Sequence, residues 1–175
     1  AKAVFDKQLA FLRSQKKQLP EAIHYGIMLE VPALAEQLDL LAPKISFLSI
    51  GTNDLTQFLF AADRANPKLA ERYDWLSPAI LRFLRRVIRS VDGHDVDIAV
   101  CGEMGGRRLE ALALLGLGIR RLSITPAAVG PTKDLVSKVD LQEIGAAMEQ
   151  WLAHPPEDMR AALTAWAAER GITVD

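Results

Sequence analysis

Short apolar runs alternate with amphipathic stretches along most of the chain. Four of these runs are short enough to be strands, and they cover residues 23–30, 45–50, 96–101 and 121–124. Each run is nearly continuous in apolar residues, which is typical of strands buried on both faces of a parallel sheet. The pattern therefore predicts four strands separated by helices.

Helical periodicity fills the segments around these runs. The first amphipathic stretch is predicted to end at Pro20, and Pro32 is predicted to open the helix after the first strand. Ser77 followed by Pro78 predicts a longer helix to about Val91. Further helices are expected over residues 109–117, 135–139, 141–152 and 156–169.

Alternation of strands and helices indicates repeated βα units, so the predicted fold class is α/β with a parallel sheet. Four units make half of an eight-stranded barrel or a small open sheet, and the pattern leaves both open. No linker or low-complexity segment interrupts the chain, so residues 1–175 are expected to form a single domain.

Polar or reactive side chains follow three of the predicted strands. Glu30 ends the first, Asn53 and Asp54 follow the second, and Cys101 with Glu103 end the third. The carboxyl ends of parallel strands lie on one face of a barrel, where active sites are assembled. We therefore expect these residues to share one site.

The carboxylates of Glu30 and Asp54 are suited to bind a hard cation together. Mg²⁺ takes oxygen ligands, often one or two carboxylates with substrate phosphate completing its coordination. The alternative is that Asp54 caps the following helix and Glu30 lies in solvent beside a turn.

Asn53 and Arg64 are candidates for binding an anion. Asn53 offers an amide donor beside the backbone N–H groups at the start of a helix. Arg64 offers a guanidinium that can bind a phosphate or carboxylate through two hydrogen bonds. An ordinary Asx turn and a solvent-exposed arginine are the competing interpretations.

Cys101 is the lone cysteine of the chain. A thiol that is mostly protonated at neutral pH suits a proton donor to an enolate carbon. A buried structural cysteine is the alternative, and Glu103 is either a carboxylate that orients a neighbour or an ion-pair partner. His24, His94 and His154 show no metal-ligand spacing and are given no function.

The composition is ordinary for a globular protein and does not by itself indicate a function. Of 175 residues, 50% are hydrophobic and 25% charged, and the net charge of -1 gives no general attraction to nucleic acid or an anionic membrane. A single cysteine and the lack of a long apolar stretch indicate a cytoplasmic protein without a membrane span. The arginines at positions 82, 85, 86 and 89 are interpreted first as the solvated face of a helix.

Four sequence blocks resemble enzyme I, the phosphoenolpyruvate–protein phosphotransferase family. They are GIMLEVP (26–32), SIGTNDLTQ (49–57), ADR (62–64) and CGEM (101–104). Their order and spacing are similar to those of the family, and the similarity extends over residues 26–133. The tail looks closer to the nitrogen-branch type of the family.

The resemblance implies a fold and a set of roles. The chain would form the last four βα units of a (βα)8 TIM barrel that binds phosphoenolpyruvate (PEP), followed by carboxyl-terminal helices. Glu30 and Asp54 would ligate Mg²⁺, Asn53 and Asp54 would bind PEP, Arg64 would bind its anionic groups, and Cys101 would protonate enolpyruvate to pyruvate.

The resemblance also implies partners. The phosphoryl group would pass to a histidine on an amino-terminal domain that is not in this sequence, then to an HPr-type carrier, and the enzyme would be a homodimer. Without the first four barrel strands, the isolated segment is expected to be inactive and to self-associate through its open sheet.

Two other interpretations stay open. A dikinase-type enzyme, such as pyruvate phosphate dikinase or PEP synthase, shares much of the same barrel. A non-catalytic module for dimerisation or regulation is the second. Met104 favours enzyme I, whereas Gly105 stands where the family would have alanine.

Overall fold

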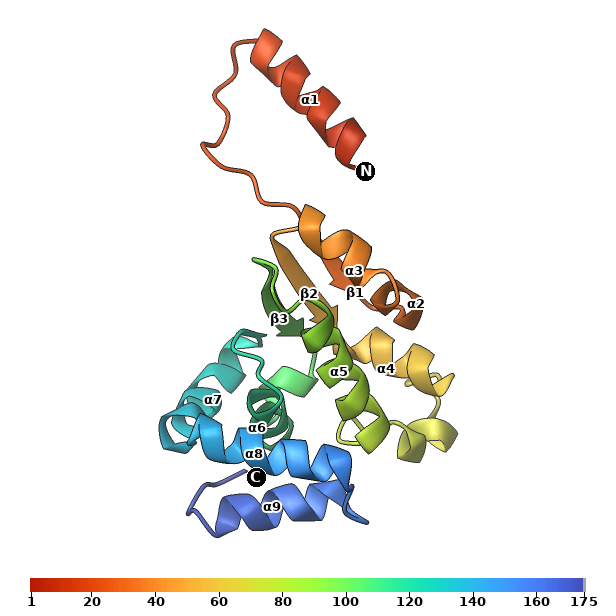
Figure 1. Cartoon of the computed structure of the whole chain (residues 1–175), viewed down its shortest axis with the longest axis vertical. Coiled ribbons are helices and arrows are strands. Elements are labelled where there is room, and N and C mark those ends of the chain that lie inside the picture. The colour runs from red at the N-terminus through yellow and green to blue at the C-terminus, as the bar shows by residue number, and fades with distance from the viewer. Residues whose placement is uncertain (175) are drawn as a thin grey trace.

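A parallel four-stranded sheet forms the centre of the chain in the computed structural model, which describes residues 1–174 apart from the side chains of residues 70 and 71 (Figure 1). The strands are β1 (Gly26–Leu29), β2 (Phe47–Gly51), β3 (Asp97–Cys101) and β4 (Leu122–Ser123). They lie in the order β1-β2-β3-β4, and each neighbouring pair is parallel. The predicted α/β class with a parallel sheet is confirmed.

Helices connect the strands. Between β1 and β2 lie α2 (Pro32–Ala35), α3 (Leu38–Leu41) and the 3-10 turn η1 (Ala42–Lys44); between β2 and β3 lie α4 (Thr52–Phe60), η2 (Pro67–Arg72) and α5 (Pro78–Ser90). The turn η3 (Met104–Gly106) and α6 (Arg108–Gly116) join β3 to β4. Helices α7 (Pro126–Lys138), α8 (Leu141–Ala153) and α9 (Met159–Ala168) follow β4, and α1 (Lys2–Ser14) precedes the sheet.

The two faces of the sheet differ in their cover. Alternate residues of a strand point to opposite faces, and the register aligns them across the strands. One face packs into the core, and its fully buried side chains are Leu29, Leu48, Ile50 and Val100. The opposite face carries Met28 and Phe47, which remain 50% and 42% exposed. This second face is referred to below as the open face.

Helix α5 packs its apolar side into the core. Its Ser77 hydroxyl accepts a hydrogen bond from the Ala79 N–H, and Pro78 occupies the first turn, as the sequence predicted. The buried side chains are Ile80, Leu81, Phe83, Leu84, Val87 and Ile88.

Helix α6 is surrounded by the carboxyl-terminal helices α7, α8 and α9 (Figure 1). Its residues 109–115 are buried, and its Gly116 allows a close approach to α8. A Cβ atom at Gly116 would lie 2.4 Å from Cγ of Met148 and 3.1 Å from the backbone oxygen of Ile144. This packing joins the end of the chain to the sheet.

Helix α1 lies apart from the remaining helices, and residues 15–25 connect it to β1 (Figure 1). None of its residues is buried. Its contact with the start of β1 runs through Tyr25, whose hydroxyl donates to Asp6 at 2.9 Å and whose ring meets Phe5 edge to face.

Several predicted boundaries differ from the structure. Residues 23–25 lie outside β1, and the helix opened by Pro32 is divided into α2 and α3 because Glu36 and Gln37 adopt a turn. The helix expected from residue 135 begins at Pro126, where proline fits the first turn. The last helix begins at Met159 because the Asp158 side chain caps it. No helix within residues 1–174 is long and apolar enough to cross a bilayer.

Candidate functional site

Three of the predicted site residues, Glu30, Asn53 and Cys101, lie around Gly51 at the carboxyl end of β2. The register pairs Gly51 with Cys101 of β3, and Glu30 is the residue that follows the last pair of β1 and β2. Helix α4 starts immediately after Gly51 and carries Asn53 and Asp54 in its first turn. The parallel strands thus bring three segments that are distant in sequence to the same end of the sheet, where the carboxyl ends of the strands lie.

Glu30 lies against the backbone of Gly51. A Cβ atom on Gly51 would be 2.6 Å from Cγ and 2.8 Å from Oε1 of Glu30. The side chain is partly buried, so Glu30 does not simply extend into solvent beside a turn. Glycine at position 51 leaves the space that this carboxylate occupies.

Helix α4 begins directly after β2. Thr52, Asn53 and Asp54 are already helical, and the N-cap residue is Gly51, which has no capping side chain. Asp54 therefore does not serve as the N-cap of α4, which leaves its carboxylate available for another role. The first-turn N–H groups lack partners within a helix and carry partial positive charge.

Asn53 is fixed by the loop that follows β3. Its Oδ1 accepts a hydrogen bond from the Glu103 N–H at 3.4 Å. Gly102 has φ +103, and a Cβ atom there would lie 2.9 Å from the Thr52 hydroxyl oxygen. Because the amide oxygen is used in this bond, the amide N–H groups of Asn53 remain to donate to an anion.

Cys101 is partly buried and shares a sheet face with Ser49, so its thiol belongs to the open face. The Ser49 hydroxyl donates to Sγ at 3.3 Å, and the thiol donates to the Ile50 carbonyl at 3.5 Å. These bonds orient the thiol at the strand end without enclosing it in an apolar core. The structure therefore disfavours the interpretation as a buried structural cysteine.

Arg64 lies in the loop after α4. That helix ends at Ala61 in the left-handed conformation, with φ 48, and the Arg64 N–H donates to Oε1 of Gln57 at 3.3 Å. The Arg64 side chain is exposed. The loop after the carboxyl end of α4 thus presents an exposed guanidinium.

Tyr73 belongs to the site, and our sequence analysis gave it no role. Its hydroxyl donates to the backbone oxygen of Asn53. Burial of the ring raises the pKa of the Tyr73 phenol; the Arg64 guanidinium opposes the rise, and the Asp54 and Glu103 carboxylates add to it. The hydrogen bond from Tyr73 to Asn53 joins this loop to the first turn of α4.

A second unpredicted contact ties helix α9 to the same loop. Arg160 pairs with Asp74 at 2.7 Å and with Glu110 of α6 at 2.9 Å, and the Glu110 side chain is only 3% exposed. Burial lowers the pKa of the Arg160 guanidinium, but hydrogen bonds to the two carboxylates outweigh this effect and raise it. No local pattern predicts such contacts, since they join residues far apart in sequence.

A metal ion at this site would depend on oxygen ligands from both protein and substrate. No cluster of three or more His, Cys, Asp or Glu side chains with the geometry of a metal site occurs among the described residues. Glu30 and Asp54 supply two carboxylates, which is the number that Mg²⁺ commonly takes from a protein when substrate phosphate is also a ligand. The donor set therefore fits Mg²⁺ bound together with a phosphorylated substrate.

Several known proteins are similar in sequence to this chain. A PEP–protein phosphotransferase of Borreliella burgdorferi is 41% identical over 133 residues, covering 76% of this chain and 23% of the relative. The PEP-dependent phosphotransferase system protein of Escherichia coli K12 is 39% identical over 148 residues, covering 84% of this chain and 20% of the relative. A multiphosphoryl transfer protein of Xanthomonas campestris is 49% identical over 108 residues, covering 62% of this chain and 13% of the relative.

The chain spans a quarter or less of the length of these relatives. Residues 1–141 match the family model described as PEP-utilising enzyme, PEP-binding domain. That match includes the residues around Gly51 and the loop that carries Arg64 and Tyr73. The chain therefore belongs to the family of PEP-utilising enzymes.

Proposed function

We propose that this chain is the carboxyl-terminal part of a PEP–protein phosphotransferase, the enzyme that transfers the phosphoryl group of PEP to a protein histidine and releases pyruvate. The observation that carries the proposal is the meeting of Glu30, Asn53 and Cys101 around Gly51. In this proposal the four βα units are half of a TIM barrel. The relatives named PEP–protein phosphotransferase support it.

The proposed binding roles follow from the groups at the strand ends. The amide N–H groups of Asn53, the first-turn N–H groups of α4 and the Arg64 guanidinium bind the phosphate and carboxylate of PEP. Glu30 and Asp54 would hold Mg²⁺. Neutralising the negative charge of PEP is the chemistry that Mg²⁺ would supply there.

Phosphoryl transfer breaks the bond between phosphorus and the enol oxygen of PEP and forms a bond to a histidine nitrogen outside this chain. Enolpyruvate remains at the strand ends. The thiol of Cys101 then gives its proton to the methylene carbon of the enolate, whose electron pair forms the new C–H bond, and pyruvate results. Solvent restores the thiol proton.

We expect the histidine to lie in another domain of the complete enzyme, with an HPr-type carrier as the next acceptor. The name of the multiphosphoryl transfer protein is in keeping with serial transfer of this kind. We propose that the enzyme lies in the cytoplasm, where the thiol of Cys101 stays reduced. We propose that the complete enzyme is a homodimer, as the resemblance implies, and that the isolated chain self-associates through its open face.

Calorimetry tests substrate binding by this chain. PEP titrated in the presence of Mg²⁺ should release or absorb heat, and the heat should disappear with EDTA and in Asp54→Asn. Asp63→Asn, an exposed carboxylate in the loop after α4, is the matched control and should behave as the unmodified chain. The same heat with and without Mg²⁺, or in Asp54→Asn, would contradict the proposed metal site.

The dikinase alternative is tested in the complete enzyme. Phosphoryl transfer from labelled PEP to an HPr-type carrier supports the proposal, whereas transfer to AMP supports a dikinase. A non-catalytic module should transfer the phosphoryl group to neither acceptor, and the chain should show no heat of PEP binding.

A further inference from the structure

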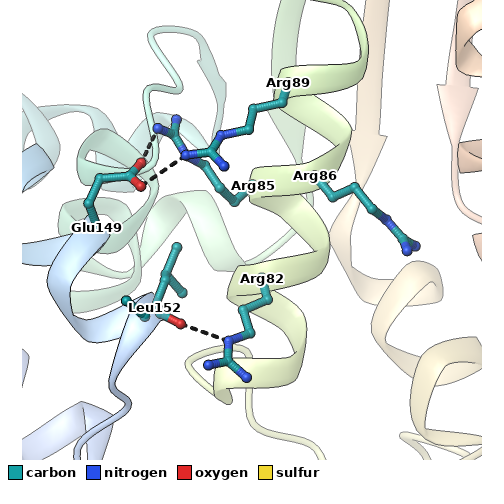
Figure 2. A pocket seen from close by; sticks show the side chains of 7 residues that line it. Arg82, Arg85, Arg86, Arg89, Glu149 and Leu152 are labelled. Carbon is teal, nitrogen blue, oxygen red and sulfur yellow. Dashed lines mark hydrogen bonds and ion pairs between the residues drawn. The ribbon is translucent and has the colours of Figure 1, made fainter.

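A cavity of about 360 Å³ lies between α5 and α8, outside the strand-end site (Figure 2). Its lining residues are Arg82, Arg85, Arg86, Arg89, Glu149, Leu152 and Ala153. The sequence suggested that the α5 arginines form a solvated face. The structure turns Arg82, Arg85 and Arg89 towards α8 instead, and these are referred to below as the arginine triad.

Backbone carbonyl groups hold two members of the arginine triad in place. Nε of Arg82 donates to the Leu152 oxygen at 2.8 Å, and Nη1 of Arg85 donates to the Leu117 oxygen at 3.2 Å. The Arg85 side chain is only 27% exposed. Anchored guanidinium groups lose less conformational entropy when they bind a ligand than free surface arginines do.

The charges around the cavity do not balance. Glu149 pairs with Arg85 and, at 3.0 Å, with Arg89, so one carboxylate faces the arginine triad and two positive charges remain in excess. Arg86 does not contribute, because it pairs with Glu36 at 2.9 Å and its guanidinium points away in Figure 2. Glu149 is the only acidic residue among those that line the cavity.

The arginine triad also has hydrogen-bonding capacity left. Nε of Arg85 is buried and has no hydrogen-bond partner within the described part of the chain. A buried N–H group without an acceptor is costly, so an added acceptor would be favourable. A guanidinium also matches the oxygen geometry of phosphate through paired hydrogen bonds.

We propose that the arginine triad is a binding site for a small phosphate dianion, either free phosphate or the phosphate group of a phosphomonoester. The ligand brings the two negative charges that the cavity lacks and competes with Glu149 for Arg85 and Arg89. The cavity volume lies near the lower end of the range of about 300–1,000 Å³ for small-molecule sites. Leu152 and Ala153 offer an apolar wall to a short organic substituent.

The test is a titration of inorganic phosphate into the purified chain at about 150 mM chloride, where diffuse surface attraction is screened. The Nε–H signals of arginine in NMR spectra are the readout. We expect saturable shifts for Arg82, Arg85 and Arg89 and no shift for Arg86. Glu149→Gln should bind phosphate about fivefold or more tightly because the competing carboxylate is removed.

Arg89→Gln should weaken binding about fivefold or more, and Arg82→Gln, an independent second variant, should weaken it similarly. Both side chains are exposed, so thermal unfolding should show folded proteins. Arg86→Gln on the same helix is the matched control and should bind within about twofold of the unmodified chain.

Absence of saturable binding, or equal weakening in Arg86→Gln, would overturn the proposal in favour of diffuse charge attraction. Unchanged or weaker binding in Glu149→Gln would overturn it as well. Parallel titration with glycerol 3-phosphate separates the two sources of the phosphate group. Tighter binding than inorganic phosphate assigns the site to phosphomonoesters, and equal binding assigns it to free phosphate.

Discussion

At the scale of single residues, the candidate site depends on side chains held by the backbone of other segments. Glu30 lies on Gly51, the Asn53 amide is held by the N–H of Glu103, and the Cys101 thiol is held between Ser49 and Ile50. Each contact spans two different strand ends. The proposed chemistry therefore depends on the sheet register as much as on residue identity.

Cys101→Ala in the complete enzyme should slow proton exchange at the methyl group of pyruvate by about 100-fold or more, since general acid catalysis contributes about that much. PEP affinity should change little, because the thiol is assigned no contact with phosphate. NMR in deuterated water measures the rate of proton exchange, and calorimetry measures the affinity for PEP. Weaker PEP binding with normal exchange would remove the role assigned to Cys101.

Tyr73 should ionise at higher pH than an unfolded tyrosine, because burial raises its pKa. The neutral phenol is then favoured in the folded state, so its contribution to stability is complete below about pH 10, the unfolded value, and is lost as the pH rises towards the folded value. The absorbance of phenolate at 295 nm measures the ionisation of Tyr73 as the pH rises.

Tyr25 is the other tyrosine, and burial and Asp6 raise its pKa as well. Tyr25→Phe is therefore the variant in which Tyr73 titrates alone. Titration of Tyr73 in that variant at the same pH as in the urea-unfolded chain would show that the ring is not desolvated.

At the scale of elements, the sequence predicted the four strands and the helix from Pro78 well, because strong apolar periodicity and a Ser-Pro start are local signals. The helix predicted from residue 135 starts earlier, at Pro126, whose fixed backbone angle suits the first turn of a helix. The pairing of Arg160 with Glu110 could not be predicted, since packing of α9 on α6 creates it.

Arg160→Gln should destabilise the chain by about 2 kcal/mol. Loss of a partner from a fully buried ion pair costs about 3–5 kcal/mol, and we reduce that value because the Arg160 side chain is 45% exposed. The nearly buried Glu110 carboxylate would lose its partner, and the loop at Asp74 would lose its link to α9. Urea unfolding followed by circular dichroism measures the change.

Arg121→Gln removes an ion pair with Asp97 in which both side chains are more than half exposed. It serves as the control and should cost less than about 1 kcal/mol. Equal costs for the two variants would mean that the Arg160 contact contributes no more than a surface pair.

At the scale of the whole molecule, the sheet has two free edges, β1 and β4, and one open face. Unpaired strand edges and exposed apolar side chains favour association. The sequence predicted this from the count of strands alone. The structure adds Met28 and Phe47 as the residues that a partner would cover.

We expect the chain to self-associate at micromolar concentration in light scattering. Phe47→Glu should shift it towards monomer, because a charge on the open face is costly to bury. Phe58→Glu, at a phenylalanine of α4 that is 55% exposed, is the matched control and should leave the association unchanged. A monomer that unfolds cooperatively without either substitution would show that the open face needs no cover.

The contact between Glu30 and Gly51 has a genetic consequence. Any side chain at position 51 would occupy the space of the Glu30 carboxylate, since even a methyl group would lie 2.6 Å from its Cγ. Alanine at Gly51 would therefore displace the carboxylate without removing it. A selection for inactive alleles should recover substitutions of Gly51 with the same phenotype as loss of Glu30, although glycine offers no chemical group of its own.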